Sequence, residues 1–134
     1  MSEPVSDLAE LLRALRPVLN DGSYVFAVLP RDADSGALEP LATFREAEGV
    51  TVVLEEERAR LAGLRVLFRA AWITLTVHSD LQAVGLTAAV AGALTRANIS
   101  CNIIAAAHHD HVFVPAESAP AAIEALRALQ RAHQ

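Results

Sequence analysis

The chain has 134 residues, of which 53% are hydrophobic and 20% charged, and a formal net charge of −5. This apolar content can build a core, so the composition excludes intrinsic disorder, and the scattered Lys and Arg residues make nucleic acid a poor partner. The single cysteine, Cys101, excludes an internal disulfide and fits a reducing compartment. The acidic N-terminus does not resemble a signal peptide, and no apolar run is long enough to span a membrane. We therefore expect a soluble cytoplasmic protein with no membrane partner.

The N-terminal region is predicted to form an amphipathic helix. Leucines recur at i, i+3, i+4 and i+7 from Leu8 to Leu15, which is the spacing of one helical face. Asp7 and Glu10 resemble a capping box at the start of this helix. Pro17 is expected to stop it, because proline cannot continue a helical hydrogen-bond ladder.

The rest of the first half alternates β-type segments with polar connections. Its predicted elements, in chain order, are a strand at 24–29, a loop at 30–40, a hairpin of strands at 41–45 and 50–54, a short helix at 55–62 and a strand at 64–68. Gly63 is well placed as the left-handed residue after the short helix. The order is α-β-β-β-α-β, with a loop where a helix would normally connect the first two strands.

The second half has a clearer pattern. Alternation in 72–78 predicts a strand with Ile73, Leu75 and Val77 on one face. The helix predicted over 84–97 is apolar on nearly every face, so it must be covered on more than one side. The remaining elements are Asn98 as a left-handed stop, an interior strand at 99–107, a turn at His108-His109-Asp110, a strand at 111–114, and a last helix within 115–132 with Ser118 as cap and Pro120 in the first turn.

This order of elements predicts an α+β fold of two ferredoxin-like βαββαβ halves, with antiparallel sheets and helices on one face. The predicted halves are 1–69, which includes the N-terminal helix, and 70–134. The second half reads β-α-β-β-α and lacks a fourth strand, which we expect from residues 24–29 or from another chain. An open sheet edge and a helix that is apolar all round favour a homodimer.

The segment 76–87, TVHSDLQAVGLT, joins a buried strand to a buried helix. A helix start exposes unpaired N–H groups and a partial positive charge, so it can hold a carboxylate. Gly85 would let a ligand approach the backbone, Asp80 could pair with an ammonium group, and Asn102 can donate and accept hydrogen bonds. These groups suit an amino-acid zwitterion. The alternative is that Ser79 or Asp80 only caps the helix, that Gly85 only relieves crowding and that Asn102 faces solvent.

The stretch ITLTVHSDLQAVGLTAAVAGALTRANISCNIIAAAHHDHVFV resembles the ACT domain, a small regulatory βαββαβ module. The likeness is closest to the ACT repeats of aspartokinases and to small bacterial tandem-ACT proteins. LEPLATFREAEGVTVVLEE in the first half also resembles the tandem-ACT proteins. In ACT modules, two sheets often meet edge to edge and an amino acid lies at the seam, held by the turn before the first helix and by the start of the second strand.

The resemblance implies a non-catalytic module, without a cofactor, that binds an amino acid or similar small ligand at an ACT–ACT interface. The expected ligand-binding residues are Ser79, Asp80, Leu81, Val84, Gly85, Leu86, Ile99, Ser100, Asn102 and Ile103. No nucleophile elbow or Gly-rich phosphate loop suggests an enzyme. Arg45 is a second candidate for a ligand carboxylate, although a solvated strand end is favoured.

Two other functions remain open. The chain could be a structural protein without a ligand, in which the helix at 84–97 and an open sheet edge serve assembly. It could also bind a metal through the turn from His108 to His111. We expect no metal, because adjacent residues in a tight turn point apart, whereas metal sites need converging side chains. Cys101 has no basic neighbour in sequence to lower its pKa and is expected to be a small buried hydrophobe.

Overall fold

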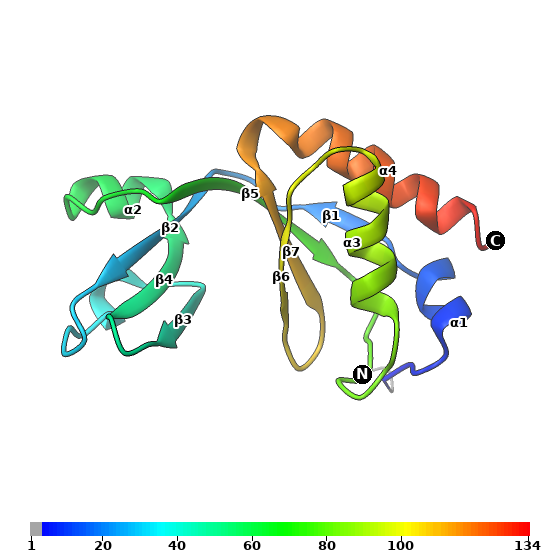
Figure 1. Cartoon of the computed structure of the whole chain (residues 1–134), viewed down its shortest axis with the longest axis horizontal. Coiled ribbons are helices and arrows are strands. Elements are labelled where there is room, and N and C mark those ends of the chain that lie inside the picture. Colours follow the sequence, from blue (N-terminus) through cyan, green and yellow to red (C-terminus); the bar gives the residue numbers. More distant parts are fainter. Residues whose placement is uncertain (1–3) are drawn as a thin grey trace. The chain divides into compact units, whose positions relative to one another are not determined.

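The computed structural model describes residues 4–134, which group into two compact units (Figure 1). Unit 1 combines residues 4–21 with residues 71–134, and unit 2 consists of residues 22–70. The predicted sequential division placed the N-terminal helix with the first half, whereas its contacts group it with the second. Residues 1–3, with which the predicted first half begins, lie outside the described residues. No helix between residues 4 and 134 is long and apolar enough to cross a membrane.

Unit 1 is an α+β sandwich of one sheet and a layer of helices. The strands lie in the order β1-β5-β7-β6, and both β1–β5 and β6–β7 pair antiparallel. The elements are α1 (Leu8–Arg13), β1 (Pro17–Leu19), the part of β5 (Phe68–Leu75) from residue 71 onward, α3 (Leu86–Arg96), β6 (Asn102–Ala105), β7 (Asp110–Pro115), the 3-10 turn η2 (Ala116–Ser118) and α4 (Ala119–Arg131).

The core of unit 1 lies between the sheet and its helices. Ile73 and Leu75 of β5 and Val112 and Val114 of β7 pack into one buried cluster with side chains from α1, α3 and α4. Because alternate strand residues point to opposite faces, the helices cover one face of this sheet. Helix α3 contacts both α1 and α4 (Figure 1). This confirms the expectation that so apolar a helix is covered on more than one side.

The fourth strand of unit 1 comes from the N-terminal segment. Pro17, Val18 and Leu19 form β1, which pairs antiparallel with Leu75, Thr74 and Ile73 of β5. The expectation that residues 24–29 or another chain supply this strand was wrong. Helix α1 ends at Arg13, before Pro17, and Arg16 adopts a left-handed φ of 43° just before the strand. Proline is tolerated here because β1 lies at the edge of the sheet.

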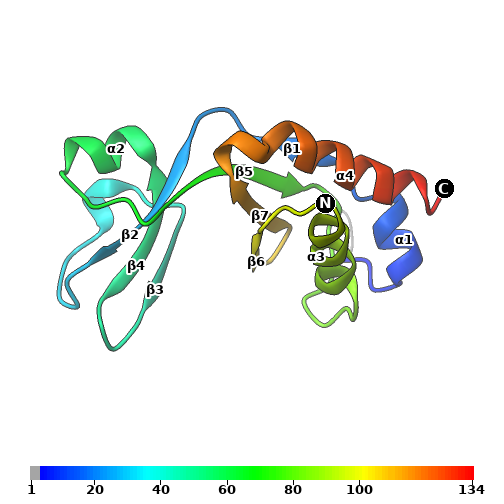
Figure 2. The same ribbon diagram turned by 45° about the horizontal axis from the view of Figure 1, so that its top comes forward.

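Unit 2 has the same strand order with fewer helices. Its elements are β2 (Tyr24–Leu29), the 3-10 turn η1 (Gly36–Leu38), β3 (Ala42–Arg45), β4 (Val50–Glu55), α2 (Glu56–Leu61) and the first residues of β5. The strands lie in the order β3-β4-β2-β5, and α2 packs against β2 and β4 (Figure 2). Leu38 packs against the core of this unit, so the loop around η1 covers sheet surface that a helix covers in unit 1.

Several local predictions are confirmed. Asp7 Oδ1 accepts a hydrogen bond from the Glu10 N–H at 3.0 Å, as a helix cap does. Gly63 has a φ of 69° and its N–H donates to the Arg60 carbonyl at 3.1 Å, which closes α2 with a left-handed residue. Asn98 ends α3 with a φ of 60°. Ser118 occupies the N-cap position of α4, but its side chain makes no capping hydrogen bond.

Two strand predictions were wrong. Of the segment predicted at 64–68, only Phe68 is in a strand, and β5 runs without a break through the predicted division near residue 70. The segment at 99–107 forms only β6, Asn102–Ala105, which lies at the edge of the sheet rather than inside it. Its low charge suggested burial, but small apolar residues such as Ala105 are also tolerated on an exposed edge.

Candidate functional site

The turn between β5 and α3 is held by the N-terminal segment. The Val5 N–H donates to the His78 carbonyl at 2.8 Å, and the Asp80 N–H donates to the Val5 carbonyl at 2.9 Å. Ser6 Oγ donates to Asp80 Oδ2 at 3.1 Å, while Asp80 Oδ1 accepts from the Gln82 N–H at 2.9 Å. Both oxygens of this carboxylate therefore help to fix the turn.

Gly85 is the N-cap residue of the 11-residue helix α3. Its φ of 104° is a conformation that residues with side chains rarely adopt. A Cβ atom at this position would also lie 3.0 Å from Leu8 Cδ2. The glycine therefore serves both the turn and the packing of Leu8. Because the N-cap residue has no side chain, it cannot cap the first N–H groups of α3.

A pocket of about 140 Å³ lies beside the start of α3, within unit 1. Its walls come from the turn after β5, from the first residues of α3 and from the β6–β7 hairpin. The lining residues are Ser79, Asp80, Leu81, Ala83, Gly85, Leu86, Thr87, Ala105 and Asp110. The pocket thus combines a helix start with two carboxyl groups.

Asp110 is the buried acid of this pocket. Its side chain is 6% exposed, and its Oδ2 accepts a hydrogen bond from Ser79 Oγ at 3.3 Å. Burial raises the pKa of Asp110, and the hydrogen bond from Ser79 and the nearby His111 and His109 only partly oppose this effect. Within the described chain, Ser79 is the one side chain that hydrogen-bonds to this carboxyl group. A cation in the pocket would therefore stabilise the ionised form of Asp110.

The pocket gathers half of the residues expected to bind a ligand. Ser79, Asp80, Leu81, Gly85 and Leu86 line it. The other five do not: Val84 is 84% exposed, Ile99 is buried in the core, and Ser100, Asn102 and Ile103 also lie outside the lining.

The register of the β6–β7 hairpin explains this difference. Asn102 pairs with Phe113 at one end of β6, whereas Ala105 pairs with Asp110 at the other end, which is the end beside the pocket. Asn102 therefore lies at the end of β6 that does not line the pocket, and its role in ligand binding stays a prediction. Asp110 was missed as a pocket residue because it sits in the histidine-rich turn. Its spacing from Val112 and Val114, which places all three on the core face of β7, could have identified it.

The histidines near this hairpin make separate contacts. Trp72 Nε1 donates to His111 Nδ1 at 3.0 Å, and burial is the main cause that lowers the pKa of His111. The rings of His78 and His108 have centroids 5.3 Å apart. Between residues 4 and 134, no three His, Cys, Asp or Glu side chains are grouped so that they could hold a metal ion. Cys101 is partly buried, and burial raises the pKa of its thiol.

Comparison with known proteins identifies the fold family. Two family models, each described as the ACT domain, match residues 3–71 and 68–128. A solved structure from Vibrio cholerae, VC0802, described as a protein of unknown function and possible transport protein, is 48% identical. It superposes with a TM-score of 0.83 over 92% of this chain and 95% of that one. Comparison with curated proteins gives no match.

More distant structures share the fold alone. Atu0741 from Agrobacterium tumefaciens is 16% identical, with a TM-score of 0.67 over 85% of this chain and 87% of that one. The regulatory subunit of aspartate kinase from Thermus flavus is 13% identical, with a TM-score of 0.61 over 84% of this chain and 95% of that one. The resemblance stated from the sequence is confirmed: the chain belongs to the ACT-domain family and contains two ACT domains in tandem.

Proposed function

We propose that this protein is a non-catalytic regulatory module that binds a small amino acid in the pocket of unit 1. The observation that carries the proposal is the meeting, in one pocket, of the start of α3 with the buried carboxyl group of Asp110. An amino acid carries one group that suits each of them.

The start of α3 suits the ligand carboxylate. The first N–H groups of a helix lack partners within the helix and carry a partial positive charge. Gly85, the N-cap residue of α3, lines the pocket and has no side chain to cap these groups, and Thr87 adds a hydroxyl group to the same wall. The carboxylate would therefore lie against the backbone of residues that follow Gly85.

Asp110 suits the ligand ammonium group. Charge pairs are stronger where water is excluded, and the side chain of Asp110 is buried. The partner that it has, the Ser79 hydroxyl, leaves the negative charge uncompensated. The pairing would lower the raised pKa of Asp110, so binding of the amino acid would weaken as the pH falls and Asp110 becomes protonated.

The size of the pocket restricts the side chain of the ligand. A volume of about 140 Å³ is below the range of about 300–1,000 Å³ that is usual for drug-sized ligands. The remaining walls are largely apolar, with Leu81, Ala83, Leu86 and Ala105. A small aliphatic side chain fits these walls better than a charged or aromatic one.

The regulatory part of the proposal rests on the fold. ACT domains are typically regulatory modules that bind small molecules, and one structural neighbour is the regulatory subunit of an aspartate kinase. The location of the ligand at an interface between ACT modules, the homodimer and the cytoplasmic location stay predictions.

A structural role is the second candidate, and the N-terminal segment favours it. Ser6 already donates to the Asp80 carboxylate, and Leu8 already fills the space beside Gly85. In this alternative the turn needs no ligand, because the N-terminal segment already supplies a hydrogen-bond donor to its carboxylate and packs against its glycine.

A thermal-shift screen of the twenty amino acids separates the two candidates. We expect one or a few small aliphatic amino acids to stabilise the protein, by about 2.7 kcal/mol at 100 times the dissociation constant. Asp110→Asn should abolish this response without unfolding the protein. Asp32→Asn, an exposed position in unit 2, is the matched control and should keep it. If no amino acid raises the melting temperature, or if Asp110→Asn responds like the wild type, amino-acid binding at this pocket is refuted.

A further inference from the structure

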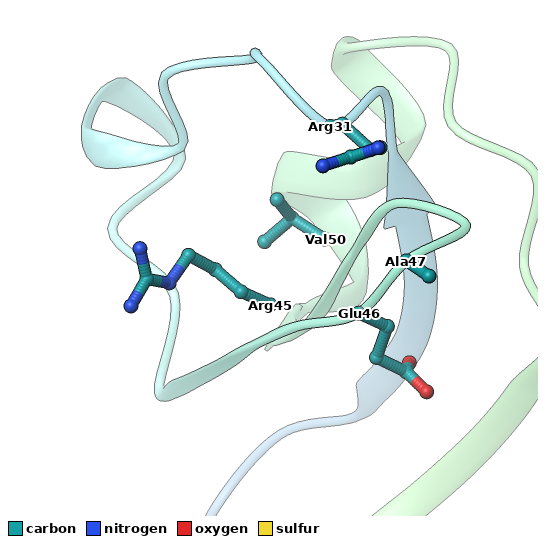
Figure 3. Close-up of a pocket in the computed structure, with 5 residues that line it drawn as sticks. All are labelled: Arg31, Arg45, Glu46, Ala47 and Val50. Atoms are coloured by element: carbon teal, nitrogen blue, oxygen red, sulfur yellow. The ribbon is translucent and has the colours of Figure 1, made fainter.

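A second pocket lies in unit 2, at the place in the fold that corresponds to the pocket of unit 1. It has a volume of about 450 Å³ and is lined by Arg31, Arg45, Glu46, Ala47 and Val50 (Figure 3). Arg31 follows β2 as Ser79 follows β5. The other lining residues come from the β3–β4 hairpin, whose counterpart, the β6–β7 hairpin, contributes two residues to the pocket of unit 1. Loop 30–40 takes the place that α3 has in unit 1 and contains no such helix. The pocket of unit 2 is larger than the pocket of unit 1.

Both arginines of the pocket are without partners in the described part of the chain. Arg31 lies in a turn closed by a hydrogen bond from the Ala33 N–H to the Pro30 carbonyl, at 3.0 Å. Arg45 ends β3, opposite Val50. No hydrogen bond or ion pair engages either guanidinium group within residues 4–134, whereas the arginines with acidic partners in this unit are Arg58, Arg60 and Arg69.

The acid of the pocket does not neutralise these arginines. The Glu46 carboxylate accepts a hydrogen bond from the Thr51 hydroxyl group. In Figure 3 this carboxylate points away from both guanidinium groups, while Val50 lies between Arg31 and Arg45. Two arginines without acidic partners therefore line the same pocket as an apolar side chain, in a protein whose net charge is −5.

We propose that this pocket binds a small organic dianion, with one anionic group at Arg31 and the other at Arg45. Guanidinium groups bind carboxylates and phosphates through planar pairs of N–H donors. The carbon skeleton of the ligand would rest on Val50 and Ala47. A volume of about 450 Å³ lies in the usual range for small-molecule sites. Dicarboxylates and phosphate monoesters share this chemistry.

Titration calorimetry on the full chain tests the site with two probes, succinate and glycerol 3-phosphate. Sodium chloride at matched ionic strength controls for non-specific screening. We expect at least one probe to bind, and the preferred probe distinguishes carboxylate from phosphoryl recognition. Arg31→Gln and Arg45→Gln should each weaken binding about tenfold or more, the usual effect of removing a hydrogen bond between charged groups.

Control variants separate this pocket from general attraction of anions. Arg65→Gln makes the same charge change at an exposed residue of unit 2 that does not line the pocket. It should leave the affinity within about twofold of wild type, because water and salt screen an exposed charge that does not contact the ligand. Asp110→Asn, in the other pocket, should also leave it unchanged. Glu46→Gln removes the negative charge of the pocket, keeps an oxygen for Thr51, and should tighten binding.

The proposal is overturned if neither probe binds above the salt control. It is also overturned if Arg65→Gln weakens binding as much as Arg45→Gln, or if Glu46→Gln weakens it. Circular dichroism of each variant confirms that the fold is intact. Should an arginine variant fail to fold, Glu46→Gln and Arg65→Gln still decide the question.

Discussion

Corresponding places in the two units carry opposite charge. In unit 1 the turn after β5 and the β6–β7 hairpin bring Asp80 and Asp110 to the start of a helix. In unit 2 the turn after β2 and the β3–β4 hairpin bring Arg31 and Arg45 together beside a loop that replaces the helix. The comparison teaches that the ACT framework decides where a pocket forms, while a few side chains decide the charge of the ligand that it suits.

The largest expected effect comes from a glycine beside the basic pocket. A Cβ atom at Gly49 would lie 2.6 Å from the Leu29 carbonyl oxygen, so Gly49→Ala forces two backbone segments apart. We expect a loss of about 3 kcal/mol in the free energy of unfolding, measured by urea denaturation. Gly36→Ala, where the nearest atom to a Cβ is a side-chain oxygen at 3.2 Å, is the control in the same unit and should cost much less. Equal losses would mean that the hairpin can relax around the new side chain.

The corresponding change at the acidic pocket should cost less. Gly85→Ala combines a strained φ of 104° with a contact of 3.0 Å to the flexible end of Leu8, which can move. We expect a loss of about 1–2 kcal/mol, because the strain of one residue in a left-handed conformation is of this size. The double variant Gly85→Ala with Leu8→Ala should show whether the contact or the backbone dominates. If Leu8→Ala restores the lost stability, the contact is the cause.

Removing the buried charge of the acidic pocket should stabilise the protein. Asp110→Asn keeps a side-chain oxygen for Ser79 but removes an anion whose pKa is raised by burial. At pH 7 we expect the free energy of unfolding to rise by about 1 kcal/mol, a gain that is common when a residue kept for function is replaced by one that suits the fold better. A loss of stability at pH 7 would show that the ionised carboxylate contributes to the fold. Arg45→Gln offers the comparison in unit 2, where an exposed side chain should change stability by less than about 0.5 kcal/mol.

The smallest expected effect is the dependence of stability on pH. Burial lowers the pKa of His111, so the unfolded chain takes up a proton there more readily than the folded chain. The stability that this residue contributes is present above the ordinary histidine pKa and is lost as the pH falls from there through the lowered pKa. Asp110 acts in the opposite direction: its raised pKa favours the folded state below the ordinary aspartate pKa, and this contribution is lost as the pH rises through the raised pKa.

Thermal melts between pH 4 and 8 measure this dependence. His111→Gln should reduce the decline of the melting temperature on the acidic side of neutrality. Asp110→Asn should reduce the change of the melting temperature at lower pH. A wild-type profile that both variants leave unchanged would place the titrating groups elsewhere.

Local patterns allowed much of the fold to be predicted. The cap at Asp7, the left-handed residues Gly63 and Asn98, and the hairpin around Gly49 all follow from interactions within a few residues. Strand β1 could not be found in this way, because three residues that begin with proline carry no strand pattern of their own. Pairing with β5, more than fifty positions away, determines this strand.

The pockets show the same limit. Gly85 and Ser79 could be predicted because they lie on one continuous turn. The strand spacing of Asp110 marks it as a residue of the core face of β7, but its contact with Ser79, 31 positions away in the sequence, follows only from the fold. Arg31 and Arg45 were missed as a pair for the same reason, since a loop of irregular structure separates them.

The order of segments in unit 1 has a consequence for synthesis of the protein. Strand β1 leaves the ribosome long before β5, its partner, because the whole of unit 2 lies between them in the chain. Unit 2, whose residues are continuous, can finish folding while the N-terminal leucines of unit 1 are still exposed to solvent and to chaperones. Delay in translation beyond residue 70 would therefore lengthen the time during which the nascent chain can aggregate.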